Sequence, residues 1–358
     1  MVTIKEIADR LGVSVSTVSK GLNGAKDISE SLRQQVLDTA VEMGYTVKRK
    51  TNTGYRLAFF IENMSCEKES DFGYELLIGF RQGAFRANHD ITVIPITPEF
   101  QTEVRFDNYM LENDYTGAFA AGLALNDPWM KQFEETAFPT VLLDNFIPKN
   151  PHLCYVGTDS EEGIEMAISH LVQLGHEKIA FLNGSKDSMI SDQRMRAYLR
   201  SMNQHKLPID PNLAIYGYFV AAAAKYHVPS FIDAGVTAIL CGNDDIAEGV
   251  IDCVKEMGFS VPEDISVIGF DDMPFASSLY PPLTTIRQNR IELGKSALHV
   301  LEGMVGGISP SKFLLRPSLT LRASSGIAKP RLAVRRSDSM DSVLRINPRL
   351  YEENLKQL

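Results

Sequence analysis

Residues Thr3 to Tyr45 read TIKEIADRLGVSVSTVSKGLNGAKDISESLRQQVLDTAVEMGY, and this stretch decides the organisation of the chain. Its pattern predicts three short helices. Thr3 opens the first helix as the N-cap of a capping box, and Gly12 ends it. Ser14 is placed to cap a second helix, and a third helix is expected from Ser29 to Met43. The stretch is therefore predicted to fold as a small all-helical head.

The second helix of this head carries small and hydroxylated side chains. Such a helix is slim enough to enter the major groove of DNA, where hydroxyls reach phosphates and a lysine reaches a guanine edge. We expect Val15 and Ser16 to contact base edges, with Lys20 beside them. The residues of the head predicted to contact DNA are Thr3, Val15, Ser16, Thr17, Ser19, Lys20 and Asn23. On the helix pattern alone, a three-helix bundle that binds no nucleic acid is the alternative.

The run IKEIADRLGVSVSTVSKGLN, followed by a third helix that closes on Gly-Tyr, resembles the N-terminal domain of the lactose-repressor (LacI/GalR) family of bacterial transcription factors. Later runs resemble the same family: HLVQLGHEKIAFLNG, AILCGNDDIAEGV, VPEDISVIGFDD, PPLTTIRQ and LTLRASSG. The resemblance extends over residues 1–326. It implies a helix-turn-helix head on a two-lobed core like that of periplasmic sugar-binding proteins. It also implies a ligand-responsive repressor that binds a pseudo-palindromic DNA operator as a homodimer.

Charge is distributed unevenly along the chain. Residues 1–56 contain nine Lys and Arg and six Asp and Glu, a net charge of +3, which leaves −12 for the remainder of a chain whose formal net charge is −9. A basic head on an acidic body fits a head that contacts phosphates and a body that does not. Because a charge of +3 predicts weak binding by one head, we expect two heads on each DNA site.

Residues 46–56, TVKRKTNTGYR, are polar and basic and are predicted to be a linker after the head, residues 1–45. The resemblance implies a short hinge helix here, whose Leu inserts into the minor groove and bends the DNA. This chain lacks the Pro-Asn and the Leu of that hinge, and the segment is shorter. We therefore expect little DNA bending. Lys48, Arg49 and Lys50 are expected to contact phosphates, and a solvated basic tether is the equal alternative.

From residue 57 the pattern changes to strands that alternate with helices, which predicts an α/β core of parallel sheets wrapped by helices. Strands are expected at 57–61, 91–96, 116–121, 140–143, 178–182, 236–241 and 266–270, and helices at 74–88, 162–174, 192–204 and 245–257. The resemblance implies that residues 57–326 form two lobes joined by three crossovers. Lobe one is then about 57–158 plus 288–318, and lobe two about 159–287 plus 319–326.

Residues 327–358 extend past this core, are made basic by Arg331, Arg335 and Arg336, and carry Tyr351, Leu355 and Leu358 at helical spacing. We expect a disordered or loosely docked C-terminal extension. A short helix that joins dimers into a tetramer is the alternative, although the run lacks repeated heptads.

Polar side chains follow the ends of several predicted strands, where ligands bind in open parallel sheets. Carboxylates accept pairs of sugar hydroxyls, Arg donates a planar set of hydrogen bonds, and aromatic rings can stack on a sugar. The residues expected to bind an effector, most simply a sugar, are Phe72, Asp144, Asp159, Arg194, Phe219, Asp244 and Asp271. The family resemblance implies this role for most of them, and helix capping is the alternative for each aspartate.

Other classes of function find less support. The four cysteines, at 66, 154, 241 and 253, lack C-x-x-C spacing and are expected to be buried thiols, and the histidines lack metal-ligand spacing, so no metal or cofactor is expected. No signal peptide and no apolar run of ~18 residues is recognised, which predicts a cytoplasmic protein without a membrane segment. The alternative to a regulator is a cytoplasmic sugar-binding or sugar-processing α/β protein.

Overall fold

The computed structural model describes residues 2–25, 27–46 and 54–329. The chain divides into a unit of Met1–Ala328 and a second unit of Lys329–Leu358, of which only Lys329 is described. The linker residues Lys48, Arg49 and Lys50 and the expected C-terminal helix lie outside the described residues. Within these ranges no helix is long and apolar enough to cross a membrane.

The three predicted helices of the head are confirmed, and local side-chain contacts set their ends. They are α1 (Ile4–Leu11), α2 (Val15–Leu22) and α3 (Glu30–Glu42). The N–H of Glu6 donates to Thr3 Oγ1 at 3.3 Å while the N–H of Thr3 donates to Glu6 Oε2 at 2.7 Å, which completes the capping box. Gly12 ends α1 in the left-handed region, at φ 67°. Ser14 Oγ accepts from the N–H of Thr17 at 3.1 Å and so caps α2.

Two six-stranded sheets follow the head. Sheet one has the order β11-β5-β4-β3-β1-β2 and consists of β1 (Arg56–Ile61), β2 (Asp90–Pro95), β3 (Gly117–Ala121), β4 (Thr140–Leu143), β5 (Leu153–Thr158) and β11 (Lys312–Leu315). Sheet two has the order β12-β10-β9-β8-β6-β7 and consists of β6 (Ile179–Asn183), β7 (Ala214–Tyr216), β8 (Ala238–Cys241), β9 (Ser266–Asp271), β10 (Thr284–Arg287) and β12 (Ser318–Thr320). All strand pairs are parallel except β10 with β12.

The chain passes between the two sheets three times, after β5, after β10 and after β11. We call each sheet with its helices a lobe. The helices of lobe one are α4 (Phe72–Arg86), α5 (Pro98–Glu103), α6 (Phe106–Glu112), α7 (Pro128–Gln132) and α12 (Arg290–Val305). Those of lobe two are α8 (Ser160–Gln173), α9 (Met189–Gln204), α10 (Ala224–Asp233) and α11 (Asp244–Glu256), with the short helices η1 (Pro211–Leu213), η2 (Ala221–Ala223) and η3 (Pro274–Ser277). The α/β fold class expected from the sequence is confirmed.

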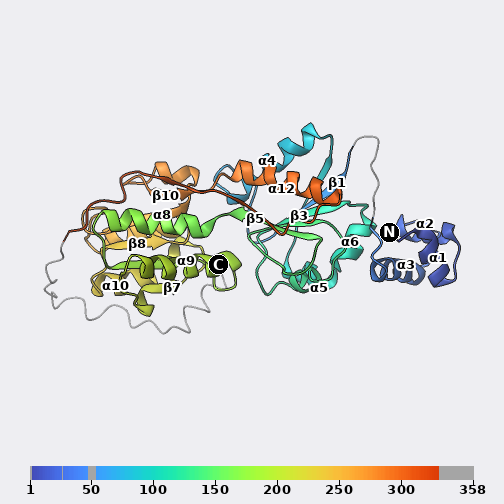
Figure 1. The fold of residues 1–358 in the computed structure, drawn as a ribbon, viewed down its shortest axis with the longest axis horizontal. Coiled ribbons are helices and arrows are strands. Elements are labelled where there is room, and N and C mark those ends of the chain that lie inside the picture. The colour runs from blue at the N-terminus through green and yellow to red at the C-terminus, as the bar shows by residue number, and fades with distance from the viewer. Residues whose placement is uncertain (1, 26, 47–53, 330–358) are drawn as a thin grey trace. The chain divides into compact units, whose positions relative to one another are not determined.

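Helices cover the central strands of both sheets, and this explains the continuous apolar runs that mark those strands. Strands β3, β4 and β5 are buried along their whole length, as are β6, β8 and β9. Figure 1 shows α4 and α12 side by side in lobe one, and both pack on the apolar side chains of β1 and β3. One of the two hydrophobic cores of lobe one therefore lies between this helix pair and sheet one.

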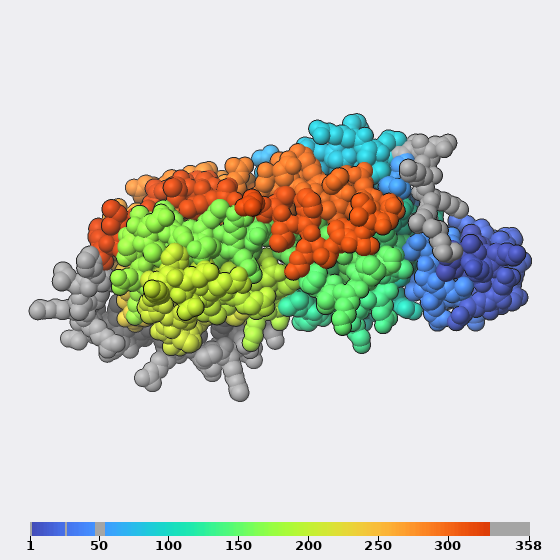
Figure 2. Space-filling view, in the orientation of Figure 1, coloured from blue at the N-terminus to red at the C-terminus, as the bar shows by residue number. Residues whose placement is uncertain are grey.

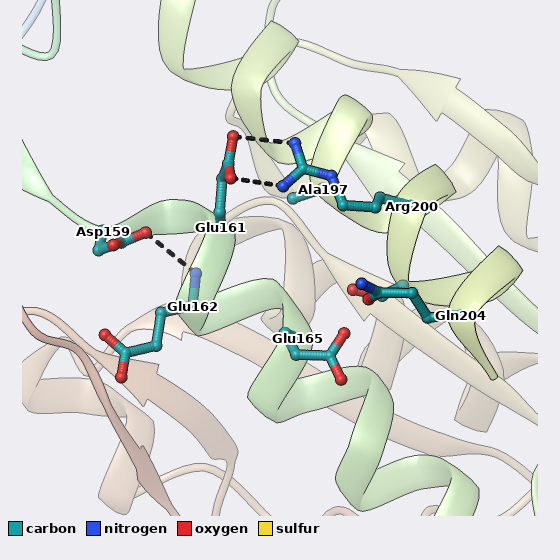
Figure 3. A pocket seen from close by; sticks show the side chains of 8 residues that line it. Asp159, Glu161, Glu162, Glu165, Ala197, Arg200 and Gln204 are labelled. Carbon is teal, nitrogen blue, oxygen red and sulfur yellow. Dashed lines mark hydrogen bonds and ion pairs between the residues drawn. The ribbon is translucent and has the colours of Figure 1, made fainter.

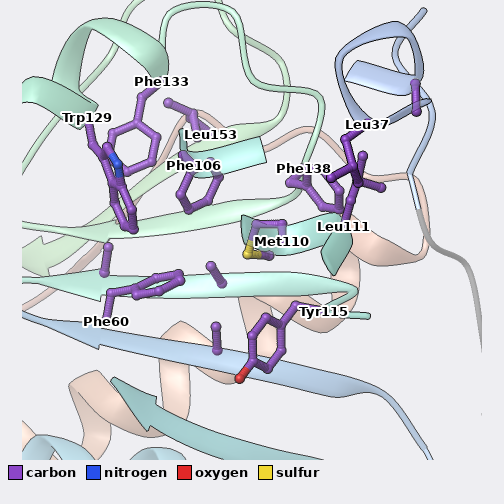
Figure 4. Close-up of a cluster of buried hydrophobic side chains, with 14 of the residues drawn as sticks. Leu37, Phe60, Phe106, Met110, Leu111, Tyr115, Trp129, Phe133, Phe138 and Leu153 are labelled. Atoms are coloured by element: carbon purple, nitrogen blue, oxygen red, sulfur yellow. The ribbon is translucent and has the colours of Figure 1, made fainter. Parts of the chain in front are cut away.

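Aromatic side chains fill the opposite face of sheet one (Figure 4). The ring of Phe60, from β1, meets the ring of Trp129 edge-on with centroids 5.0 Å apart, and Phe106 meets the same indole at 5.1 Å. Trp129 Nε1 donates to the carbonyl of Val104 at 2.8 Å, so its one polar atom is satisfied. Edge-on packing of this kind stabilises a buried aromatic core.

Two histidines attach the last described segment to lobe two. His170 Nε2 lies 3.0 Å from Ser325 Oγ, and His176 Nε2 lies 3.0 Å from the carbonyl of Gly326. Burial lowers the pKa of both imidazoles. Figure 2 shows this orange-red segment lying along the green surface of lobe two. These histidines therefore have a structural role.

The four cysteines are free thiols, and one differs from expectation. Cys154, Cys241 and Cys253 are buried, as predicted, whereas Cys66 is half-buried. Cys66 lies in the connection between β1 and α4, outside any strand or helix, and is only partly buried against the core of lobe one.

Candidate functional site

Charged side chains from both lobes meet at the carboxyl ends of strands. We call Asp144, Arg194, Asp271, Gln288 and Arg290 the interlobe cluster. Asp144 follows β4, Asp271 ends β9, Arg194 belongs to α9, and the other two follow β10. Ligands bind at this edge of parallel sheets. The structure thus brings together three of the residues predicted from the sequence, Asp144, Arg194 and Asp271.

Arg194 is the centre of the cluster and is only 2% exposed. Its Nη1 donates to the carbonyl of Gly242 at 2.5 Å, and its Nε donates to Ser160 Oγ at 3.4 Å. The guanidinium carbon lies 3.7 Å from the centroid of the Phe270 ring. Burial lowers the pKa of the guanidinium, and the carboxylates of Asp271 and Asp144 oppose that shift. Arg194 is therefore a cation held in a fixed plane.

Asp271 lies beside Arg194 in a strained backbone conformation. Its Oδ1 is 3.9 Å from Arg194 Nη2 and accepts a hydrogen bond from Gln288 Nε2 at 2.6 Å. Its φ of 116° is one that side chains rarely adopt, and such strain concentrates at functional sites. Burial raises the pKa of its carboxyl to about 6, although Arg194 opposes the shift.

Asp144 offers an oxygen that the protein itself does not use. Among the described residues, Asp144 Oδ1 is buried and has no hydrogen-bond partner. A side chain at Gly157 would come within 2.5 Å of this oxygen, so the glycine makes room for it. Burial raises the pKa of the Asp144 carboxyl to about 7, with Arg194 opposing the shift and Asp271 adding to it. A buried polar atom without a partner is costly, so this oxygen can accept from a ligand.

Other buried polar atoms without a partner stand at neighbouring strand ends and helix starts within the described ranges. They are Asn145 Oδ1, Thr158 Oγ1, Ser191 Oγ and Arg290 Nε. Asn145 adjoins Asp144, Thr158 ends β5, and Ser191 lies in the first turn of α9. Together they offer both donors and acceptors, as a site for a polar small molecule requires.

Arg290 joins the two lobes, and sequence reasoning missed it. Its Nη1 donates to the carbonyl of Asp271 at 2.8 Å, and its Nη2 lies 2.9 Å from Glu75 Oε2. The guanidinium carbon is 5.7 Å from the centroid of the Phe72 ring. The run PPLTTIRQ, which ends at Gln288, is the signal that could have drawn attention to this segment.

The two predicted aromatic residues lie in different lobes. Phe72 is the first residue of α4, in lobe one, and is half-buried beside Arg290. Phe219 is half-buried in lobe two, at a φ of 57°. Its ring covers Gly184, where an added Cβ would lie 2.0 Å from it.

Asp244 is placed differently from expectation. It is fully buried, and both carboxylate oxygens accept from the protein: Oδ2 from the N–H of Met273 at 2.7 Å and Oδ1 from Thr285 Oγ1 at 2.6 Å. Helix capping is also wrong for it, because Asn243 Oδ1 caps α11 by accepting from the N–H of Ile246. Asp244 therefore joins α11 to the segment after β9 and to β10.

Asp159 caps a helix, as the alternative reading had it. Its Oδ1 accepts from the N–H of Glu162 at 3.0 Å at the start of α8. It lines a hollow of about 300 Å³ between α8 and α9 (Figure 3), where Arg200 pairs with Glu161 at 2.7 Å. Among the described residues no group of three or more His, Cys, Asp or Glu could hold a metal ion.

Two further contacts join the lobes beside the cluster. The N–H of Leu125 donates to the carbonyl of Asp187 at 2.8 Å. Tyr155 Oη donates to Gln193 Oε1 at 3.4 Å. Since Leu125 and Tyr155 belong to lobe one and their acceptors to lobe two, the structure has the two lobes in direct contact at this edge.

The second helix of the head presents its polar face outward. Val15 is 49% exposed although it is apolar, and Ser16 and Lys20 are also exposed. Buried Val18 and Leu22 hold the other face of α2 in the head. Asn23 Nδ2 donates to the carbonyl of Ser19 at 2.6 Å, and Lys20 pairs with Asp27. The remaining predicted DNA contacts stay accessible too: Thr3 is exposed, and Thr17 and Ser19 are half-buried.

Comparisons with known proteins match the head and part of the core. The family described as bacterial regulatory proteins, lacI family, matches residues 3–47, and the periplasmic binding protein-like domain matches residues 168–325. The HTH-type transcriptional repressor PurR of Aliivibrio salmonicida (strain LFI1238) is 28% identical over 309 residues, 84% of this chain and 91% of its own length.

Two solved structures share the fold. A complex of the transcriptional regulator CelR with cellobiose is 22% identical, with a TM-score of 0.69, and covers 91% of this chain and 100% of its own. The lac repressor dimer bound to operator and the anti-inducer ONPF is 24% identical, with a TM-score of 0.65, and covers 91% and 99%.

Proposed function

The chain belongs to the LacI/GalR family of bacterial transcription regulators, and from that premise we propose that it is a repressor whose operator binding is controlled by a small molecule held in the interlobe cluster. The observation that carries the proposal is the exposed polar face of α2 in a head that matches the family. Residues 1–45 would bind DNA, 46–56 would be the linker, and 57–326 would bind effector and form the dimer.

Within the head, we assign Val15 and Ser16 to base edges and Thr17 and Ser19 to phosphates. An exposed apolar Val15 at the start of α2 suits a thymine methyl group. Lys20 would exchange its contact with Asp27 for a phosphate or a guanine. Two heads related by a twofold axis would read two half-sites of a pseudo-palindrome, which calls for a homodimer; a tetramer is the alternative. Because the proposed partner is bacterial DNA, we propose that the protein acts in the cytoplasm.

For the effector we propose a sugar. Arg194, Asp144 and Asp271 supply the donors and acceptors that recognise hydroxyls, and Phe72 and Phe219 supply apolar surface. CelR, which shares the fold, forms a complex with cellobiose. Asp159 and Asp244 are the least supported of the predicted contacts, because their carboxylates already accept hydrogen bonds from the protein.

A gel-shift assay tests the proposal, using full-length protein and the DNA upstream of its own gene. We expect a specific complex at low salt that weakens as salt rises, because phosphate contacts release counterions. A panel of cellobiose, maltose, glucose, galactose, adenine and hypoxanthine is then screened by thermal shift. A compound at ~100 times its Kd adds about 2.7 kcal/mol to the free energy of unfolding. Absence of any specific complex, with and without the panel, would refute the proposal.

The second candidate is a sugar-processing enzyme, and the raised pKa values of Asp144 and Asp271 favour it. Turnover of a nitrophenyl glycoside that disappears in Asp144→Asn would support this rival. We expect no turnover, because the relatives are transcription regulators.

A further inference from the structure

We propose that His89 and Glu302 are positioning residues for the control of DNA binding. They tie the last residues of the linker, Gly54 and Tyr55, to the far end of the α4–α12 helix pair, whose near end contacts the interlobe cluster. The inference rests on the proposed function, since it assigns a route from the effector to the linker.

At the far end, His89 joins three segments of chain. Its Nδ1 accepts from the N–H of Tyr55 at 3.1 Å, and its Nε2 donates to Glu302 Oε1 at 2.9 Å. These two bonds require the neutral imidazole that carries its proton on Nε2. The side chain of His89 is only 6% exposed, and its ring centroid is 4.9 Å from that of Tyr55. His89 thus links the end of α4, the last turns of α12 and the start of β1.

The backbone of Gly54 is packed closely against the backbone that follows α4. An added Cβ at Gly54 would lie 2.1 Å from the carbonyl oxygen of Asn88, so the end of the linker runs directly against the residues that follow α4. The N–H of Asp90 donates to the carbonyl of Tyr55 at 2.9 Å and continues this attachment into β2. A displacement of the end of α4 therefore displaces residues 54 and 55.

At the near end, both helices begin at the interlobe cluster. Arg290 is the first residue of α12, and Glu75 lies in the first turn of α4. Their ion pair of 2.9 Å fastens the two helix starts together, and Arg290 also donates to the carbonyl of Asp271 in lobe two. Any molecule that changes how Asp271 sits relative to Arg290 acts on both helices.

Between the two ends, α4 and α12 pack as a single body. A Cβ at Gly79 would lie 2.0 Å from the carbonyl oxygen of Ile291, and one at Gly294 would lie 2.1 Å from that of Leu76. The helices therefore meet backbone to backbone. Glu302 follows Arg290 by twelve residues, about 18 Å along a helix that rises ~1.5 Å per residue. Closely packed elements of this kind move as rigid units, which carries a change at one end to the other.

The mechanism requires contacts that differ between the bound and free states. Binding at the interlobe cluster shifts the start of the helix pair, and His89 and Glu302 convert that shift into a new position for Tyr55. By linkage, operator DNA bound through the linker must act back on residues 72–76 and 290–293.

The variants separate positioning from binding. His89→Phe keeps an aromatic ring against Tyr55 but removes both hydrogen bonds, and Glu302→Ala removes the acceptor. Glu302→Gln retains an acceptor oxygen and should restore the wild-type response. His299→Gln is the matched control, because it changes an exposed histidine of the same helix that lies between the two ends.

The first measurement is the ratio of operator Kd with and without the compound of the panel that gives the largest thermal shift on wild-type protein. We expect His89→Phe and Glu302→Ala to reduce this ratio by about fivefold or more, within the range of allosteric couplings. The Kd of that compound for DNA-free protein should stay within about threefold of wild type. If His89→Phe and Glu302→Ala both kept the wild-type ratio of operator Kd values, the inference would be overturned. If no compound changes operator binding by the wild-type protein, the proposed effector control fails instead.

The second measurement needs no effector. Amide hydrogen exchange is followed at 72–76 and 290–293 before and after addition of operator DNA. We expect DNA to slow this exchange in wild type and His299→Gln but not in His89→Phe, with circular dichroism showing that all are folded. If His89→Phe is unfolded, Glu302→Ala takes its place. An undiminished exchange response in the folded variant would overturn the inference whatever the effector is.

Discussion

The carboxyl of Asp144 is held by the fold in a state that a solvent-exposed aspartate does not adopt. Burial raises its pKa to about 7, and the same cause raises that of Asp271 to about 6. Near neutral pH, Arg194 therefore faces two carboxyls that are partly protonated, so their charge changes in the physiological range. We therefore expect the interlobe cluster to respond to pH near neutrality.

Stability should report the Asp144 shift directly. An unfolded Asp titrates near 3.9, so between that pH and about 7 the folded protein binds a proton that the unfolded chain does not. The stability contributed by neutral Asp144 is thus complete below ~4 and is lost as pH rises through ~7. Asp144→Asn stays neutral, so its melting temperature relative to wild type should rise from pH 5 to pH 8. A pH-independent difference for Asp144→Asn would contradict the assignment.

Arg194 should control the concentration at which the effector acts. Its charged hydrogen bonds are worth about 1.5–3 kcal/mol each, so Arg194→Ala should need roughly ten- to a hundredfold more effector to change operator binding. Operator affinity without effector should be unchanged, because the reading helix lies in the head. Arg194→Lys serves as the control for charge, and circular dichroism for folding. A folded Arg194→Ala with an unchanged midpoint would remove Arg194 from the site.

Asp244 should behave differently from Arg194. Asp244→Ala leaves the N–H of Met273 and the hydroxyl of Thr285 without their acceptor, at a cost of about 1–3 kcal/mol for each buried group. We therefore expect a lower melting temperature with an unchanged effector midpoint. A shifted midpoint at wild-type stability would restore Asp244 as an effector contact.

Among the elements, the α4–α12 pair shows how glycine permits a contact that larger residues exclude. Gly79 and Gly294 each face the backbone of the other helix, where no Cβ fits. The pair covers β1 and β3, so its spacing also sets the packing of lobe one. A change in that spacing would move the residues at both ends of the helix pair.

Substitution of two glycines of this pair should have opposite results. Gly79→Ala places a methyl group 2.0 Å from a carbonyl oxygen, and the overpacking should cost about 1–3 kcal/mol. Gly303→Ala, on α12, meets only the end of the Ile308 side chain at 3.1 Å, and better helix propensity adds up to about 1 kcal/mol. Thermal melts of both variants test this. If Gly79→Ala and Gly303→Ala had equal melting temperatures, α4 and α12 could move apart to accept a methyl group at Gly79 without loss of stability.

For the whole molecule, we expect the linker to determine how the heads act on DNA. Residues 46–56 carry three consecutive basic residues but no leucine and no Pro-Asn. Phosphate contacts position a protein on DNA, whereas kinking requires an apolar side chain inserted between base steps. The linker sequence therefore supports binding without strong bending.

Bending can be measured with circularly permuted operator fragments. We expect the mobility of the complex to depend little on operator position, in contrast to a relative whose hinge contains the leucine. A bend of many tens of degrees would show that residues 46–56 form a hinge helix in spite of their sequence. A gel with a leucine-hinged relative on the same fragments is the control.

The sequence by itself determined the head and the strand–helix alternation. Caps such as Thr3 with Glu6 and Ser14 with Thr17 join residues three positions apart, so local chemistry sets them. Most buried strands were recognised because both faces are covered, and their ends differ from the prediction by at most two residues. Neither β5 nor β10 is among the predicted ranges, although both are largely buried. Short edge strands such as β7, β11 and β12 have no continuous apolar run, because part of their surface is exposed, and they were missed.

Only the tertiary structure decided which polar side chains share the interlobe cluster. Arg290 reaches Asp271 and Glu75 because the chain crosses between the lobes before α12, and no local pattern reports that proximity. Asp244 has the residue type and place of a ligand contact, yet its oxygens are used by residues 29 and 41 positions away. Capping acts over a few residues of chain, whereas burial and pairing of charge depend on segments that only the complete fold brings together.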